Sequence, residues 1–204
     1  MKNPLIILIL TVAASVFSAF IKIEKELDLG QNMPKQEVKM KNVDGTMLSL
    51  KEASGENGLL VIFSSNTCPW VIAWEDRYND LHEIAQKNGV GMIVINSNEA
   101  QRDDEDSFEA MKEHSRQLNY SFSYVLDKDH EVADAFGATR TPHVFLFDKD
   151  LNLVYRGAID DNSRNKNEVT KPYLINAIGN MVSNKTIDPA TTRSLGCTIK
   201  RKGA

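Results

Sequence analysis

The fold is decided by the stretch Val61-Ile-Phe-Ser-Ser-Asn-Thr-Cys-Pro-Trp-Val-Ile-Ala-Trp-Glu-Asp-Arg77, in which one cysteine separates two kinds of sequence. Gly58–Phe63 is a short continuous apolar run, as expected of a strand buried on both faces. From Pro69 to about Lys87 apolar residues recur near helical spacing, and a proline suits the first helical turn, where no N–H is needed. Cys68 is therefore predicted at the start of a helix, where the helix dipole and backbone N–H groups favour the reactive thiolate.

The rest of the chain alternates in the same way between strand patterns and helix patterns. Asp44-Gly45 between two alternating runs predicts a hairpin over residues 39–51. The further predicted elements are, in order, a strand at 90–95, a helix at 103–119 that opens with four acidic residues, a strand at 122–126, a short helix at 131–136, a hairpin of strands 143–147 and 151–156, and a helix at 170–182. This order predicts an α/β fold with a central mixed β-sheet flanked by helices, an N-terminal β-hairpin and parallel early strands.

The composition is that of a globular protein, with 42% hydrophobic and 25% charged residues in a chain of 204. This length suits one domain with appendages, and we place the domain at residues 33–183 and a C-terminal tail at 184–204. The formal net charge of −4 argues against nucleic acid as a partner, because such binding rests on an excess of positive charge.

The N-terminus is predicted to be a secretory signal peptide over residues 1–19. Lys2 precedes an apolar run at residues 5–12 and then small residues, and Ser18 or Ala19 offers a cleavage site. The alternative is an uncleaved membrane anchor over residues 5–21, because an uncharged stretch of this length approaches the roughly 20 residues that span a bilayer. Either way the protein is expected outside the cytoplasm, periplasmic or secreted, and a membrane is a partner only if the segment stays uncleaved.

The two cysteines, Cys68 and Cys197, are expected in an oxidising compartment, where disulfides form. Only one intramolecular pairing exists, so a structural disulfide that closes a long loop is one interpretation. The polar residues 64–67 and the helix that follows favour a reactive thiol at Cys68 instead. Thr141-Pro142 precedes the predicted strand at 143–147, where a proline interrupts a ladder, although alone this pattern is also typical of an ordinary turn.

Five segments in order resemble the redoxin branch of the thioredoxin superfamily, also described as peroxiredoxin-like or alkyl hydroperoxide reductase/thiol-specific antioxidant proteins. The segments are Val61–Arg77, Ile95–Asn98, Phe136–His143, Leu153–Asp161 and Gly196–Lys200, within a match over about residues 33–200. The resemblance implies a thioredoxin-like fold in which Cys68 is the nucleophile. It also implies that Pro142, after Thr141, is a cis-proline that faces this cysteine and leaves backbone groups free to pair with a substrate strand.

The chain departs from the two-cysteine motif of thioredoxins. The second cysteine of that motif would fall on Val71, so an exchange within one helical turn is impossible. Cys197 follows Gly196, which permits a close approach, on a tail long enough to fold back. We therefore expect Cys197 to resolve a mixed disulfide or a sulfenic acid on Cys68.

The peroxiredoxin motif Pro-x-x-x-Thr-x-x-Cys is also incomplete. Its proline and threonine fall on Val61 and Ser65, so that a hydroxyl is kept and the proline is absent. The arginine of that family would fall on Pro142 rather than on Arg140. The arrangement that activates a peroxide is therefore only partly present.

Other residues near the cysteine are weaker candidates for a substrate site. Pro69 and Trp70 are predicted to form an apolar docking rim or to pack in the core. Arg140 is predicted to stabilise a thiolate or to contact a substrate. The four histidines share no metal-ligand spacing with each other or with the cysteines, so no metal and no cofactor are predicted.

Three functional hypotheses follow from these residues. The first is an extracytoplasmic thiol–disulfide oxidoreductase that acts on protein thiols or disulfides and takes electrons from a thiol donor. The second is a thiol peroxidase that acts on small peroxides, and the third is a non-catalytic binding module stapled by a structural Cys68–Cys197 disulfide.

Overall fold

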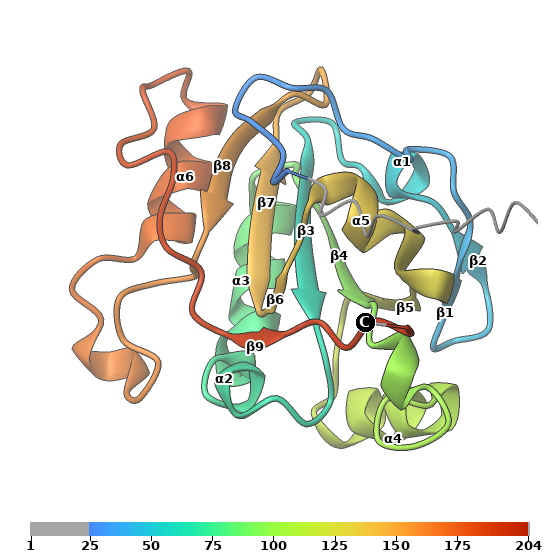
Figure 1. Cartoon of the computed structure of the whole chain (residues 1–204). Helices are drawn as coiled ribbons and strands as arrows, with labels where there is room; N and C mark the ends of the chain where they lie inside the picture. Colours follow the sequence, from blue (N-terminus) through green and yellow to red (C-terminus); the bar gives the residue numbers. More distant parts are fainter. Residues whose placement is uncertain (1–24, 204) are drawn as a thin grey trace, which may run out of the picture.

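The computed structural model describes residues 25–203, and Figure 1 shows the course of the chain. The predicted signal peptide over residues 1–19 and the alternative anchor over residues 5–21 lie outside the described residues, and both stay predictions. Within residues 25–203 no helix combines the length and the apolar character needed to cross a membrane. The domain limits at 33–183 and 184–204 also stay predictions.

A seven-stranded sheet forms the centre of the molecule, with the strand order β2-β1-β5-β4-β3-β7-β8 (Figure 1). Its strands are β1 (Met40–Asn42), β2 (Met47–Leu48), β3 (Leu59–Ser64), β4 (Gly91–Asn96), β5 (Ser123–Leu126), β7 (His143–Phe147) and β8 (Leu153–Gly157). β3, β4 and β5 are parallel, whereas β7 runs antiparallel to both β3 and β8. The predicted mixed sheet and the N-terminal hairpin of β1 and β2 are confirmed.

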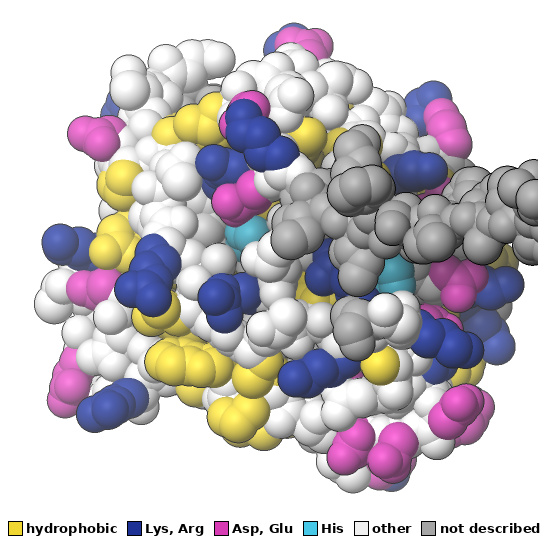
Figure 2. All heavy atoms as spheres, viewed as in Figure 1, with side chains coloured by type: hydrophobic (Ala, Val, Ile, Leu, Met, Phe, Trp, Pro, Cys, Tyr) yellow, Lys and Arg dark blue, Asp and Glu magenta, His cyan; other side chains and the backbone are white. Residues whose placement is uncertain are grey.

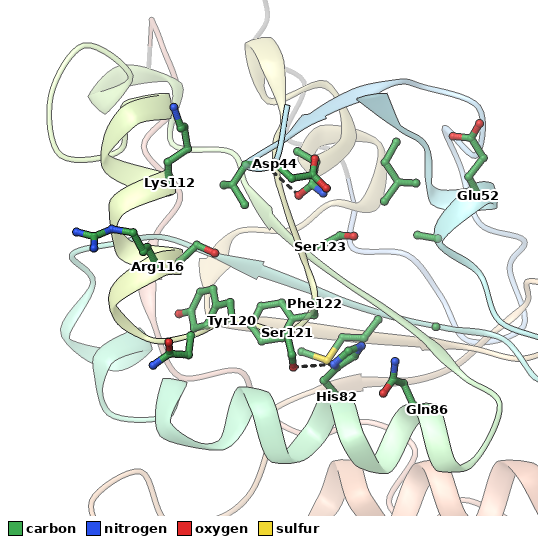
Figure 3. Close-up of a pocket in the computed structure, with 18 of the residues that line it drawn as sticks. Asp44, Glu52, His82, Gln86, Lys112, Arg116, Tyr120, Ser121, Phe122 and Ser123 are labelled. Carbon is green, nitrogen blue, oxygen red and sulfur yellow. Dashed lines mark hydrogen bonds between the residues drawn. The ribbon is translucent and has the colours of Figure 1, made fainter. Parts of the chain in front are cut away.

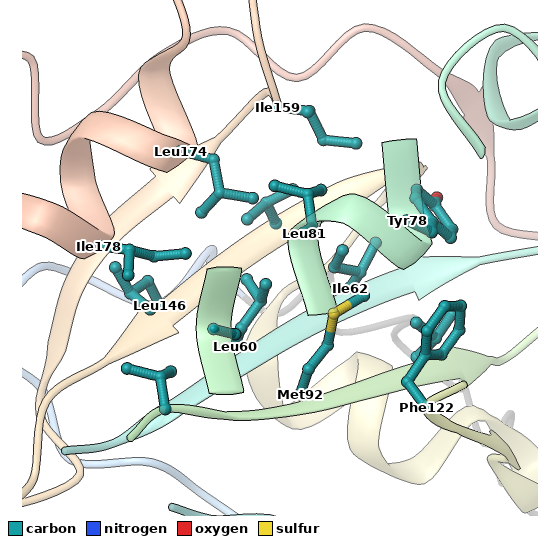
Figure 4. Packing of buried hydrophobic residues seen from close by; sticks show 14 of the residues in the cluster. Leu60, Ile62, Tyr78, Leu81, Met92, Phe122, Leu146, Ile159, Leu174 and Ile178 are labelled. Carbon is teal, nitrogen blue, oxygen red and sulfur yellow. The ribbon is translucent and has the colours of Figure 1, made fainter. Parts of the chain in front are cut away.

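Helices cover both faces of this sheet (Figure 1). They are α1 (Leu50–Ala53), α2 (Pro69–Ile72), α3 (Tyr78–Lys87), α4 (Phe108–Gln117), α5 (Glu131–Phe136) and α6 (Tyr173–Val182). Because successive residues of a strand point to opposite faces, Leu60 and Ile62 of β3 pack with α3 and α6 in one cluster (Figure 4). Val61 and Phe63 pack with α1 and α5 in the other cluster. All residues of β3 are buried, as its continuous apolar run predicts.

The predicted continuous helix over residues 69–87 is wrong, because α2 and α3 are separated by a break. At the break the backbone N–H of Arg77 donates to the carbonyl oxygen of Trp74 at 3.0 Å, and the guanidinium of Arg77 donates to the carbonyl oxygen of Ala73 at 2.8 Å. This geometry lets the Trp74 indole and the Arg77 guanidinium both reach the carboxylate of Asp160, at 2.9 and 3.0 Å. A buried ion pair therefore replaces one turn of regular helix.

The predicted helix over residues 103–119 starts later than expected, at Phe108. Its acidic residues were expected in the first turn, but they precede the helix. Asp106 is fully buried, and its carboxylate accepts the backbone N–H of Asn66 at 2.9 Å instead of facing the helix dipole. Ser107 takes the N-cap position and accepts the N–H of Ala110 at 3.3 Å.

Replacing Asp160 by alanine is expected to lower the free energy of unfolding by about 3–5 kcal/mol, because it leaves the buried Arg77 guanidinium without its carboxylate. Asp76 is a matched control, since it contacts the same guanidinium at 3.2 Å from a half-exposed position. Asp76→Ala should cost less than about 1 kcal/mol. Urea denaturation of both variants measures the difference, and equal losses would contradict this account of Asp160.

Candidate active site

Cys68 lies where β3 has ended and α2 begins. It is the N-cap residue of α2, its carbonyl oxygen accepts the N–H of Ile72 at 3.0 Å, and Pro69 occupies the first helical turn. The structure thus places the sulfur at a helix N-terminus, as the sequence indicates. It does not leave this sulfur open to solvent: Cys68 is only 5% exposed.

A cis peptide bond joins Thr141 to Pro142, next to this cysteine. The Cys68 thiol donates to the carbonyl oxygen of Thr141 at 3.1 Å. A thiolate has no proton to donate, so this contact belongs to the protonated form of Cys68. The structure therefore brings together the cysteine and the Thr141-Pro142 segment, which are far apart in the sequence.

The C-terminal tail returns to this place as a short strand. β9 (Cys197–Thr198) pairs antiparallel with β6 (Arg140–Thr141), in a register that sets Cys197 opposite Thr141 (Figure 1). The approach requires glycine at position 196, because a Cβ atom there would lie 2.4 Å from the carbonyl oxygen of Thr141. The pairing brings Cys197 close enough to Cys68 for its thiol to lower the pKa of Cys68. Both cysteines are free thiols in this structure.

Contacts beyond Cys197 hold the tail in place. Ile199 is buried against one hydrophobic cluster, and its N–H donates to the carbonyl oxygen of Thr139 at 3.1 Å. The N–H of Lys200 donates to the side-chain oxygen of Asn98 at 2.8 Å. The guanidinium of Arg201 donates to the carboxylate of Asp134 and to the carbonyl oxygen of Ala138, both at 2.7 Å. The tail is therefore fixed against the loops that surround Cys68.

The two thiols differ in acidity. Burial raises the pKa of Cys68, but hydrogen bonds, first among them the one from Cys197, lower it by more, so the net change is downward. Burial raises the pKa of Cys197, and its hydrogen bond to Cys68 and the charge on Cys68 raise it further. Lys200 acts in the opposite direction on the pKa of Cys197, through its positive charge. Ionisation of the pair therefore places the negative charge on Cys68 and leaves the proton on Cys197.

A buried polar network supports the loop before Cys68. The carboxylate of Asp106 accepts the backbone N–H of Asn66 at 2.9 Å and the side-chain amides of Asn96 and Asn98 at 2.6 and 2.7 Å. Asn98 also carries the tail contact to Lys200. Sequence reasoning missed this role of Asp106, although polar residues directly after a buried strand, as at 96–98, were a usable signal.

The other predicted site residues have mixed outcomes. Trp70 is 39% exposed and stacks on Trp74 at a ring-centroid distance of 6.0 Å, so it belongs partly to a rim and partly to the core. The backbone of Trp70 lowers the pKa of Cys197. The hydroxyl of Ser65 is buried and has no hydrogen-bond partner among the described residues. Arg140 is exposed and donates to the carbonyl oxygen of Gly196 at 3.0 Å, so it binds the tail.

A cavity of about 970 Å³ lies away from the cysteines, between α3, α4 and the β1–β2 turn (Figure 3). Its lining is polar and carries both charges, and along α4 Lys112 pairs with Glu109 and Arg116 with Glu113. His82 lines it too and is hydrogen-bonded to Ser121 at 2.9 Å. Within residues 25–203 no group of three or more His, Cys, Asp or Glu side chains could hold a metal ion.

The redoxin family model matches residues 28–171, which is more than half of the chain. The chain belongs to the redoxin family. The matched span of this redoxin contains Cys68 and Pro142, whereas Cys197 lies beyond its end. The fold is thioredoxin-like, as the sequence predicts.

This redoxin is similar to a curated oxidoreductase and to two solved structures. The thiol-disulfide oxidoreductase ResA of Bacillus thuringiensis is 24% identical over 150 residues, which cover 74% of this chain and 81% of that protein. The crystal structure of an uncharacterized conserved protein of Geobacillus kaustophilus is 33% identical, with a TM-score of 0.79, over 87% of this chain and 94% of that one. The crystal structure of a hypothetical protein of Sinorhizobium meliloti is 30% identical, with a TM-score of 0.80, over 88% and 98%. The family and the curated relative together support a thioredoxin-like redox function.

Cys197→Ala is expected to raise the pKa of Cys68, because it removes the hydrogen bond that contributes most to lowering it. Cys197→Ser is the matched control, since a hydroxyl still donates to the thiolate and should keep part of the shift. NMR titration of the ¹³C-labelled Cys68 side chain measures the pKa of this thiol separately from that of other groups. An unchanged titration in Cys197→Ala would mean that the tail does not tune this sulfur.

Asp106→Asn is expected to destabilise the protein by about 2 kcal/mol or more, because an amide cannot accept all the N–H groups that converge on the buried carboxylate. Asp104→Asn, at an exposed position of the same loop, should be near neutral. Urea denaturation compares the two variants. A stable Asp106→Asn protein would show that the network is not needed to hold the loop.

Proposed function

We propose that this redoxin is an extracytoplasmic thiol–disulfide oxidoreductase whose redox couple is Cys68 and Cys197. The observation that carries the proposal is the pairing of β9 with β6, which sets Cys197 opposite Thr141, while the thiol of Cys68, at a helix N-terminus, donates to the carbonyl oxygen of the same Thr141. The location outside the cytoplasm is supported by the signal-like residues 1–19 and suits a protein that cycles through a disulfide. The name of the curated relative, a thiol-disulfide oxidoreductase, supports the same reaction class.

In the first step the Cys68 thiolate attacks one sulfur of a substrate disulfide. A new S–S bond forms between Cys68 and the substrate, the original S–S bond breaks, and one substrate thiolate leaves. The lowered pKa of Cys68 provides the thiolate, and its place at the start of α2 stabilises the charge.

In the second step Cys197 resolves the mixed disulfide. Once Cys68 is bonded to the substrate it carries no negative charge, so the charge that raised the pKa of Cys197 is gone. Cys197 then loses its proton more readily and attacks the sulfur of Cys68, which releases the second substrate thiolate. The protein is left with a Cys68–Cys197 disulfide, and an external thiol donor returns the two electrons.

The protein reacts in turn with a substrate disulfide and with a thiol donor, so its Cys68–Cys197 disulfide has to be easy to reduce. A structural disulfide in a secreted protein has a potential below about −300 mV, and a working one lies well above this value. The acidity of Cys68 favours the working kind, because a stabilised thiolate makes the reduced form more stable.

Trapping tests the proposal. Reduced Cys197→Ser protein, mixed with a disulfide substrate, should accumulate a stable mixed disulfide on Cys68, because the resolving sulfur is missing. Cys68→Ser should accumulate less in the same time, because burial, the first cause of the raised pKa of Cys197, remains after Cys68 is removed. Mass spectrometry of the adducts gives the yields, and failure of Cys197→Ser to trap any disulfide would refute the proposal.

A further inference from the structure

The strand edge beside Cys68 is already paired. Extended polypeptides bind to proteins by adding a strand to an edge whose backbone N–H and C=O groups are unpaired. Here the backbone groups of β6, directly before the cis-proline, are taken by β9 of the same chain. The place expected to receive a substrate strand is thus filled by the tail.

The tail is anchored on both sides of Cys197. Upstream, the N–H of Thr192 donates to the carbonyl oxygen of Arg156 at 3.0 Å, and its hydroxyl contacts that of Tyr155 at 2.8 Å. Downstream, Ile199 is buried and Arg201 holds Asp134. An incoming polypeptide would have to displace β9 to pair with β6, and the contacts on both sides of β9 oppose that displacement.

The docked tail also limits access to sulfur. Cys68 is 5% exposed, whereas Cys197 is half-buried at the surface. A small disulfide does not pair with the backbone groups of β6, so its approach does not require β9 to leave this edge.

The surface around the tail is positively charged, although the whole chain is acidic. Residues 190–203 contain no Asp or Glu, and their Arg193, Lys200 and Lys202 are exposed, as is the neighbouring Arg140. None of these four forms an ion pair within residues 25–203, and Figure 2 shows Lys and Arg side chains around this face. Lys200 lies close enough to Cys197 to act on its sulfur electrostatically. This field attracts anions.

We infer that the substrate is a small anionic disulfide, and that the docked tail excludes disulfides on extended polypeptides. The inference rests on the proposed function and names its substrate class. Reduced protein with two thiols and one small disulfide give the Cys68–Cys197 disulfide and two small thiols, so the protein loses two electrons and the small disulfide gains them. Two features select the substrate. The paired β6 edge limits the size of the disulfide that can react, and the basic tail favours a disulfide with negative charge.

The test compares four oxidants of the reduced wild-type protein: dithiodipropionate, which is dianionic, neutral hydroxyethyl disulfide, dicationic cystamine, and a short unstructured peptide dimer linked by a disulfide. Loss of protein thiols gives each rate constant. At low salt we expect the dianion to react about tenfold faster than the dication, with the neutral disulfide between them, and the gap to narrow as salt is added. The peptide should react at least tenfold more slowly than the neutral disulfide.

Variants test the size limit and the charge preference for the substrate separately. Gly196→Val prevents docking by contact with Thr141, and Arg201→Ala removes an anchor more gently. Because undocking also withdraws Cys197 from Cys68, the rates are compared as a ratio: both variants should raise the rate with the peptide, relative to the rate with the neutral disulfide, about tenfold or more. Thr198→Val, an exposed change on the same strand, should not. Lys200→Glu should lower the rate with the dianion severalfold, and Lys185→Glu, an exposed change outside residues 190–203, should not.

Each outcome decides a part of the inference. A wild-type protein that reacts equally fast with peptide and small disulfides overturns the exclusion. An unchanged ratio of the peptide rate to the neutral-disulfide rate in folded Gly196→Val and Arg201→Ala proteins overturns it too. Equal rates for the three small disulfides overturn the preference for anions. In both cases the proposed function stands, whereas oxidation by none of the four disulfides removes the proposed function and this inference together.

Discussion

The pairing of β9 with β6 is the constraint on which the candidate site depends. It holds only because position 196 is glycine: any side chain there would meet the carbonyl oxygen of Thr141, which itself accepts the thiol proton of Cys68. Thr141 therefore contacts both the tail and the cysteine. A residue 129 positions further along the chain, Cys197, is brought to Cys68 by this one close approach.

That proximity couples the two sulfurs. The hydrogen bond from Cys197 lowers the pKa of Cys68, and the resulting charge on Cys68 raises the pKa of Cys197. The same contact thus activates one thiol and restrains the other. When Cys68 loses its charge, one cause of the raised pKa of Cys197 is removed, and this gives the proposed two-step exchange its order.

Much of the fold could be predicted from the sequence. Local periodicity and turn chemistry predict the buried strand β3, the Asp-Gly hairpin and the start of a helix directly after Cys68. All three are present. The helix limits could not be predicted. Helix α2 breaks so that Trp74 and Arg77 reach Asp160, and α4 starts late because Asp106 turns inward to Asn66; both partners are remote in sequence. A local sequence pattern cannot predict contacts with residues that are remote in the chain.

The sequence by itself determined the fold class, the family and the place of Cys68 at a helix start, because these depend on the order of residues along short segments. It left the relation between Cys68 and Cys197 open, as well as the exposure of Cys68. Only the tertiary structure decided that the tail lies across the cysteine and covers it. The physical reason is that this placement depends on backbone hydrogen bonds to β6, a glycine-sized gap and the burial of Ile199, which exist only once the sheet has formed.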